Sequence, residues 1–295
     1  MNSMKKALLF ALAFSSGAIL FAAEETTKAA ARQEWDIPGW ELVWHDEFDK
    51  DGKPDKKDWN FEHGFCRNHE DQWYQEENAV IKDGKLIITC EKLEKPVKNP
   101  NYVPGSNDWK RNREWIEYTS ASMTTARKHE FLYGRFEIKA KLPMEDGMWP
   151  AFWTVGATGG WPSGGEIDIM EYYKQRLHAN VAWQGFNKTE WESQNRLVSE
   201  FEKKDKDFRN KWHVFRMEWS EDFIDLYVDD QLMNEQDISV VRNAYGNITN
   251  PFRHKHYPWV NLAIGGDNGG DLKNVKFPKQ YEIEYIRIYQ RPTKK

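Results

Sequence analysis

The strongest constraint on the fold of this chain is a two-residue alternation of apolar and charged side chains. It recurs in residues 85–90, 133–141, 223–228 and 281–289, where branched or aromatic residues alternate with charged ones. This period is typical of antiparallel strands with one face on a core and the other in water. A 3.6-residue period is rare, and only residues 198–207 suggest a short helix or a charged loop. We therefore predict an all-β fold, a two-sheet antiparallel β-sandwich or jelly roll.

The composition agrees with one folded domain. The chain has 295 residues, of which 15% are aromatic and 30% charged, a ring content that argues against disorder. Sandwiches of this length commonly form a single domain, and no linker-like tract interrupts residues 33–292, so we predict one domain there. Residues 24–32 are polar and Ala-rich and are predicted to be a short flexible tether. The net charge of −5 gives no reason to expect nucleic acid as a partner.

The first 23 residues have the layout of a secretory signal peptide. Lys5 and Lys6 precede an apolar stretch over residues 7–21, and the small residues Ala22 and Ala23 follow. An uncleaved anchor is the alternative, but the stretch is short and interrupted against the roughly 20 residues that a membrane span needs. We predict that residues 1–23 are a cleaved signal peptide, with the exact cleavage site left open, and that the protein is secreted or periplasmic with no stable membrane insertion.

Two cysteines leave one question open. Cys66 and Cys90 could pair in an oxidising compartment. Cys90 ends a predicted strand, so a small buried core residue is at least as good an interpretation.

The most informative segment holds three carboxylates among apolar residues. Glu166 and Asp168 are two residues apart and project from the same face of a strand. Glu171 has the wrong parity for that face, but one inserted residue, a β-bulge near residues 169–170, would restore it. We therefore predict that all three acids line one face.

Crowded carboxylates repel one another, so one is driven towards its protonated form while another stays ionised. Retaining hydrolysis of a sugar acetal needs this split, with one carboxylate as nucleophile and one carboxyl as proton donor. We predict Glu166 as nucleophile, Glu171 as acid/base and Asp168 as the residue that orients and tunes them. An acidic strand that faces water or binds a cation is the alternative.

Tryptophans surround this segment. Trp149, Trp153 and Trp161 lie shortly before the acids, and Trp183 follows them. Flat indole faces suit the apolar faces of sugar rings, although Trp is more often a core residue. We predict that these four rings contact substrate.

These motifs, in this order, resemble glycoside hydrolase family 16, in its laminarinase-like branch with the bulged E-x-D-x-x-E motif. The resemblance rests on residues 44–48, 133–143, 149–153, 161–162, 166–171, 215–230, 261–266 and 281–289. It implies a β-jelly roll with a concave substrate cleft and endo-acting, retaining hydrolysis of β-linked polysaccharides, with no metal in catalysis. It gives Glu166, Glu171 and Asp168 the same three roles. We expect a glycan substrate and a monomer.

The resemblance also implies two peripheral sites. Arg67 and Asn68 would reach sugar hydroxyls at the non-reducing end of the cleft, with a surface loop as the alternative. A structural calcium would lie near Glu47, Gly84 and Glu284, although Glu284 stands where Asp is expected.

The substrate stays open between two classes. Glucan-cleaving relatives often carry His in the strand after the acids, where this chain has Ala182, although His178 could serve instead. The sequence therefore allows β-1,3- or mixed-linkage glucan, or β-galactosyl glycans such as poly-N-acetyllactosamine and mucin O-glycans. Transglycosylase activity and a non-catalytic, lectin-like sandwich are the alternatives to hydrolysis.

Overall fold

The computed structural model describes residues 35–292. The predicted signal peptide, residues 1–23, and tether, residues 24–32, lie outside the described residues, and the domain boundaries 33–292 stay a prediction. The chain divides into two compact units, of which one comprises residues 44–288 and the other includes residues 35–43 and 289–292. In the described part of the chain, no helix is both long enough and apolar enough to cross a membrane.

Strands dominate the described chain. Their bounds are β1 Glu41–Asp46, β2 Asn60–Phe61, β3 Gln72–Tyr74, β4 Ala79–Ile81, β5 Leu86–Lys98, β6 Trp115–Ser120, β7 Ser122–Thr124, β8 Gly134–Lys141, β9 Met148–Gly156, β10 Glu166–Tyr173, β11 Arg176–Gln184, β12 Thr189–Leu197, β13 His213–Trp219, β14 Phe223–Val228, β15 Gln231–Asp237, β16 His256–Ile264 and β17 Lys279–Gln290. The helices are short: α2 Trp109–Asn112, α3 Val198–Glu202, α4 Gly266–Gly269, η1 Glu76–Asn78, η2 Phe208–Asn210 and η3 Pro251–Arg253.

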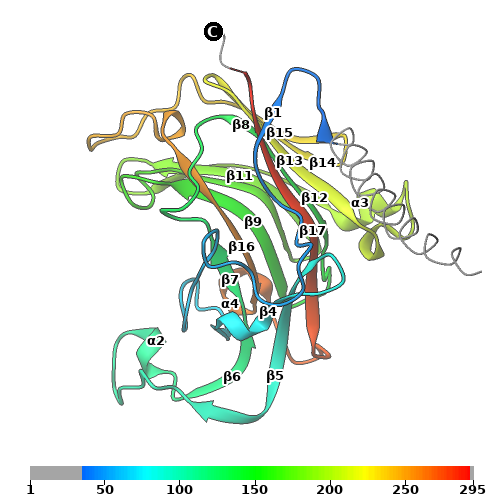
Figure 1. Ribbon diagram of the computed structural model, residues 1–295. Helices are drawn as coiled ribbons and strands as arrows, with labels where there is room; N and C mark the ends of the chain where they lie inside the picture. Colours follow the sequence, from blue (N-terminus) through cyan, green and yellow to red (C-terminus); the bar gives the residue numbers. More distant parts are fainter. Residues whose placement is uncertain (1–34, 293–295) are drawn as a thin grey trace, which may run out of the picture. The chain divides into compact units, whose positions relative to one another are not determined.

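Two sheets form the unit of residues 44–288 (Figure 1). One has the order β15-β14-β13-β8-β17-β5-β6-β3, with β4 also paired to β5, and the other has the order β12-β11-β10-β9-β16-β7-β2. The strand pairs are mostly antiparallel, whereas β3 and β6 are parallel. The predicted all-β, two-sheet antiparallel fold is confirmed.

The core lies between the sheets and follows the alternation. Along β13 every second residue is buried, and β14 repeats the pattern. Phe136 and Phe215 from one sheet and Phe152 and Ile167 from the other are completely buried in the same cluster. The alternate side chains of each strand project from the opposite face, and on the sheet that contains β10 this second face carries the acids.

Both cysteines are unpaired thiols in the structure. Cys90 is completely buried, which agrees with its interpretation as a small core residue. Burial raises the pKa of the Cys66 thiol to about 12, and the neighbouring Glu62 carboxylate adds to the shift. The thiol therefore stays protonated and poorly reactive at neutral pH.

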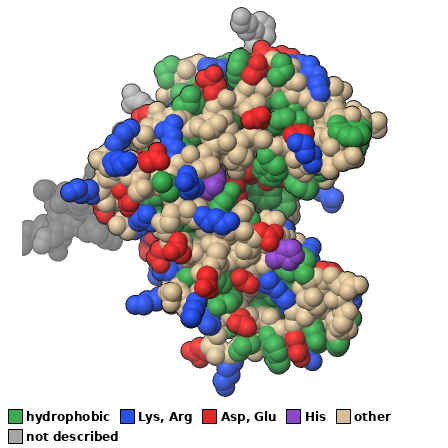
Figure 2. Space-filling model, turned by 180° about the vertical axis from the view of Figure 1, so that it is seen from behind, with side chains coloured by type: hydrophobic (Ala, Val, Ile, Leu, Met, Phe, Trp, Pro, Cys, Tyr) green, Lys and Arg blue, Asp and Glu red, His purple; other side chains and the backbone are tan. Residues whose placement is uncertain are grey.

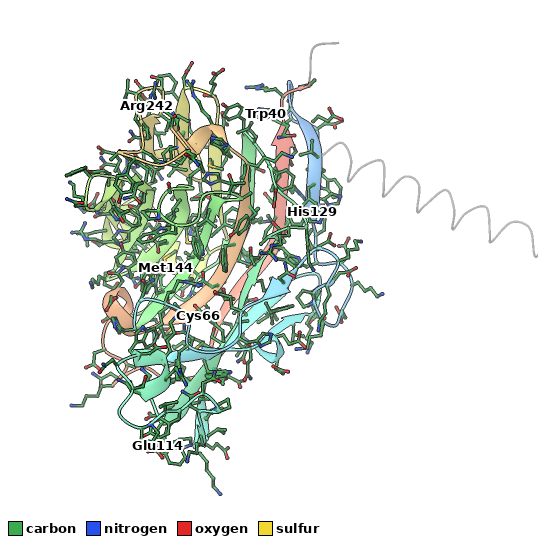
Figure 3. All side chains as sticks on the ribbon, turned by 90° about the vertical axis from the view of Figure 1, so that its left-hand side faces the viewer. Trp40, Cys66, Glu114, His129, Met144 and Arg242 are labelled. Carbon is green, nitrogen blue, oxygen red and sulfur yellow. The ribbon has the colours of Figure 1, made fainter. Side chains whose placement is uncertain are left out.

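The alternating segments become strands close to their predicted limits, and α3 begins at Val198, where a short helix was one of two interpretations. The main difference is β5, which runs to Lys98, well beyond Cys90. Its extension and β6 carry an arm over residues 99–114, with Glu114 labelled on it in Figure 3. The polar residues of this arm show no periodic pattern of apolar side chains, so the sequence did not predict it.

Candidate active site

A β-bulge on β10 brings the three acids to one face. Glu166 and Asp168 pair in regular register with β9 and β11, and the register then shifts between Asp168 and Glu171 on the β11 side. On the β9 side the shift lies between Asp168 and Met170. The bulge that the parity of Glu171 predicted is therefore present, and it turns Glu171 to the same face as the other two acids.

This face forms the floor of a cleft of about 660 Å³. Figure 2 shows a hollow in which hydrophobic side chains gather. Its lining combines aromatic rings, carboxylates and amides from five strands (β9 to β12 and β16), two loops and helix α4: Arg67, Asn68, Glu70, Trp149, Ala151, Trp153, Val155, Gly156, Gly160, Trp161, Gly165, Glu166, Asp168, Glu171, Tyr173, Asn180, Trp191, Ser193, Tyr257, Trp259, Asn261, Asp267 and Asn268.

Two indole N–H groups donate hydrogen bonds to the outer acids. Nε1 of Trp149 donates to Oε1 of Glu171 at 2.7 Å. Nε1 of Trp161 donates to Oε2 of Glu166. Trp149 is 6% exposed, whereas Trp161 is 60% exposed. Trp149 therefore holds Glu171 from within the fold, and Trp161 covers Glu166 from the open side.

Asn180 links Asp168 to Glu171. It lies opposite Asp168 on β11. Its amide nitrogen donates to Oδ2 of Asp168 at 3.0 Å and to Oε2 of Glu171 at 3.1 Å. Because one amide holds both carboxyls, Asp168 and Glu171 are fixed relative to each other.

Burial shifts all three carboxyls towards their protonated forms. Burial raises the pKa of Glu171 to about 7, although the hydrogen bond from Trp149 opposes the shift. Burial, together with the negative charges of Glu171 and Glu166, holds the pKa of Asp168 well above its usual range. Burial also raises the pKa of Glu166. A cluster of this kind retains a proton near neutral pH, as an acid catalyst requires.

Arg67 belongs to a partly buried ion-pair network at the cleft wall. Its guanidinium donates to both carboxylate oxygens of Glu62, at 2.8 and 2.7 Å, and lies 3.8 Å from Glu70. Burial opposes ionisation of Glu62, but Arg67 lowers its pKa below the ordinary value. Asn68 beside it donates to Glu70 at 3.3 Å. Both predicted residues line the cleft, and Figure 3 labels the adjacent Cys66 over the strands.

A stacked pair of indoles lies below Arg67. The rings of Trp153 and Trp259 are 4.8 Å apart at an angle of 15°. The Arg67 guanidinium lies 5.1 Å from the first ring and 5.3 Å from the second. Trp153 also donates to the Asn261 side-chain oxygen at 2.8 Å. The structure therefore brings Trp149, Trp153 and Trp161 together in the cleft.

The structure places Trp183, the fourth predicted ring, outside the cleft. Trp183 is absent from the cleft lining, and its ring packs against the core beside Phe252, with centroids 6.3 Å apart. The reason is parity: Asn180 and Ala182 project from the cleft face of β11, so Trp183 projects from the other face.

Neither candidate histidine position places an imidazole in the cleft. Ala182 lies directly opposite Glu166 and is completely buried. His178 lies opposite Glu171, but its ring stacks on Tyr173 with centroids 3.7 Å apart. Burial lowers the pKa of His178 to about 4, so the imidazole is neutral and supports Tyr173 from below.

Several residues that line the cleft were not predicted from the sequence. Asn180, Tyr173, Trp191 and Trp259 line the cleft and were not predicted. Asn180 shares the parity of Ala182, which was a signal available in the sequence. Tyr173 likewise shares the parity of Glu171 on the same strand. Trp191 and Trp259 depend on the register between strands, for which a single sequence carries no signal.

The carboxylates expected to bind calcium do not fit that role. Both oxygens of Glu47 accept hydrogen bonds from Arg287, at 2.9 and 2.8 Å. Glu284 pairs with Lys139 at 2.7 Å. Within residues 35–292, no three His, Cys, Asp or Glu side chains are grouped to hold a metal ion. A guanidinium and an ammonium already neutralise these acids, and they would repel a cation there. Gly84 adds no side-chain ligand.

Known proteins share this architecture. A β-glucanase of Rhodothermus marinus is 31% identical, and the match covers 98% of this chain and 96% of that protein. A solved structure, from work in which prominent members of the human gut microbiota express endo-acting O-glycanases to initiate mucin breakdown, has a TM-score of 0.77 and 32% identity, covering 86% of this chain and 92% of the other. The laminarinase catalytic domain of Thermotoga maritima has a TM-score of 0.69 and 32% identity, covering 85% and 98%.

These likenesses confirm the jelly-roll prediction and extend over nearly the whole described chain. The sequence profile of glycosyl hydrolases family 16 matches residues 67–285, which include all three acids and most of both sheets. The chain is a glycoside hydrolase and belongs to glycosyl hydrolases family 16.

Proposed function

We propose that this enzyme is a secreted, endo-acting β-glycosidase that retains anomeric configuration. The observation that carries the proposal is the bulge on β10, which turns Glu166 and Glu171 to one face with Asp168 between them. The cleft lies on an open sheet face, so a long glycan can pass through it and be cut internally.

In the first step the ionised Glu166 attacks the anomeric carbon while protonated Glu171 donates its proton to the leaving glycosidic oxygen. The bond to the leaving sugar breaks and an ester to Glu166 forms. In the second step the ionised Glu171 takes a proton from water, whose oxygen displaces Glu166 from the anomeric carbon. Asp168 and Asn180 hold Glu171 between its two roles. Two carboxyls supply the acid and the nucleophile, so this chemistry requires no cofactor.

For the substrate, we propose a β-galactosyl bond within a complex glycan of the mucin O-glycan or poly-N-acetyllactosamine type. Ala182 beside Glu166 supports this choice, because glucan-cleaving relatives often carry a histidine in this strand and His178 is stacked under Tyr173. The likeness to the structure described for mucin breakdown, at a TM-score of 0.77 against 0.69 for the laminarinase, points the same way.

A β-1,3- or mixed-linkage glucan is the second candidate. It is favoured by the β-glucanase relative, whose match covers 98% of this chain.

The experiment is a product profile on mucin O-glycans, a poly-N-acetyllactosamine, agarose, laminarin and mixed-linkage β-glucan. Galactose at the new reducing ends supports the first candidate, and glucose oligomers replace it with the second. NMR of the first-formed product reports the stereochemistry: a β-anomer supports retention, whereas an α-anomer refutes it. Products longer than the starting oligosaccharide would identify transglycosylation. The Glu166→Gln enzyme is the inactive control, and wild-type turnover in it would refute the mechanism.

Export and a monomeric state belong to the same proposal. The charged and apolar layout of residues 1–23 supports export, which N-terminal sequencing of the exported protein tests. Light scattering of the purified enzyme tests the monomer.

A further inference from the structure

The cleft does not end at the acids but continues to the edge of the sheet. Beyond β10 it crosses β11 and reaches β12, the edge strand, where Trp191 and Ser193 line it. The strand register places Trp191 opposite Ala182, which lies opposite Glu166. Two strand spacings separate Trp191 from Glu166, so their Cα atoms are about 10 Å apart. The indole therefore lies beyond a sugar that contacts the acids.

Trp191 differs from the other tryptophans of the cleft. Four of them are held by other side chains: each indole donates a hydrogen bond, and three also contact another aromatic ring. These are Trp149, Trp153, Trp161 and Trp259. Trp191 is 45% exposed, and no hydrogen bond or ring contact within residues 35–292 holds its indole. A large, half-exposed ring on the wall of a sugar cleft, with no hydrogen bond or ring contact in the described residues, is available for a ligand.

The two sides of the cleft are built differently. On the β9 and β16 side, the Trp153 and Trp259 rings and the Arg67 network enclose the floor. The sugar whose anomeric carbon reacts must be held and distorted, which needs such enclosure. On the β12 side the strand is largely exposed, so a cleaved fragment can leave and water or another sugar can enter.

We propose that Trp191 is a binding platform for the leaving-group part of the glycan, on the reducing-end side of the cleaved bond. The inference rests on the proposed function and assigns one subsite of it. The ring stacks on a sugar beyond the one that accepts the proton from Glu171. It thereby selects chains long enough to extend past the acids, and it favours internal over terminal cleavage.

The test uses hexasaccharides carrying ¹⁸O at the reducing end, laminarihexaose and a poly-N-acetyllactosamine hexasaccharide, with the wild-type, Trp191→Ala and Phe186→Ala enzymes. Phe186 is the matched control, since it lies in the same hairpin, is 74% exposed and is absent from the cleft lining. Neither side chain makes a hydrogen bond or a ring contact within the described residues, so both variants should keep the wild-type melting temperature.

For Trp191→Ala we expect kcat/KM to fall about threefold to tenfold, the range for one lost aromatic contact. Labelled fragments should become shorter, because fewer sugars are held on the leaving side. Phe186→Ala should match wild type. Unchanged cleavage positions in Trp191→Ala, longer labelled fragments, or the same shift in Phe186→Ala would each overturn the inference alone. If the wild-type enzyme cuts neither hexasaccharide and none of the polymers, the proposed function fails, and this inference fails with it.

Discussion

The hydrogen bond from Trp149 to Glu171 should set the alkaline limit of activity. Glu171 must be protonated to act as the acid, so kcat/KM should fall as the pH rises through its pKa of about 7. The Trp149 N–H favours the ionised carboxylate and so lowers this pKa. Trp149→Phe removes the donor and keeps an aromatic ring, which should raise the pKa of Glu171 and move the alkaline limb to higher pH.

The size of the shift follows from the contacts of the carboxyl. A hydrogen bond to a charged group is worth about 1.5–3 kcal/mol, and one pKa unit corresponds to about 1.4 kcal/mol. Asn180 still donates to the other oxygen of Glu171 in the variant. The neutral acid also loses a weaker bond, so the lower end of the range applies. We expect a shift of about one pKa unit.

The assay is kcat/KM against pH between 4 and 10, on whichever glycan the wild-type enzyme cuts, because this ratio reports the ionisations of the free enzyme. Trp153→Phe is the matched control. It also removes an indole donor from the cleft, but its acceptor is Asn261, which does not titrate. Its KM can change, whereas its alkaline limb should stay in place. A limb in Trp149→Phe that stays within 0.3 units of wild type (~0.4 kcal/mol), or moves down, would refute the reasoning.

Three further outcomes follow from the same contacts. Burial raises the pKa of Glu171 from 4.5 to about 7, so the wild-type protein loses stability as the pH rises through this range and the carboxyl ionises. Glu171→Gln should therefore have a free energy of unfolding about 3 kcal/mol higher than wild type at pH 8 and nearly equal at pH 4, measured by urea unfolding. A variant less stable than wild type at pH 8 contradicts this. Arg67→Met leaves the partly buried Glu62 without its cation, although Ser122 still donates to it, so the free energy of unfolding should fall by about 1.5–3 kcal/mol. Adding Glu62→Met should recover part of the loss, and equal stability of Arg67→Met and wild type argues against the network. Since Glu47 is already paired with Arg287, millimolar Ca²⁺ or EDTA should leave the melting temperature unchanged, and a calcium-dependent rise would restore the calcium prediction.

Much of the fold and part of the site could be predicted because their signals are local. The alternation along β14 gave its limits without error, since burial of one strand face imposes a period of two on adjacent residues. The wrong parity of Glu171 pointed to a bulge for the same reason. The position of Trp183 was not predicted correctly, because aromatic character alone does not say which face of a strand a residue occupies.

The class of fold, the three acids and the need for a bulge can all be inferred from the amino-acid sequence, because each follows from the order of side chains along a single strand. The partners of the acids are set by the three-dimensional arrangement, since Trp149 and Asn180 come from the strands on either side of β10. It also turned Glu47 towards Arg287 instead of a metal ion, and it brought Trp191 into the cleft. These choices depend on register between strands, which the packing of the whole core fixes and no single segment encodes.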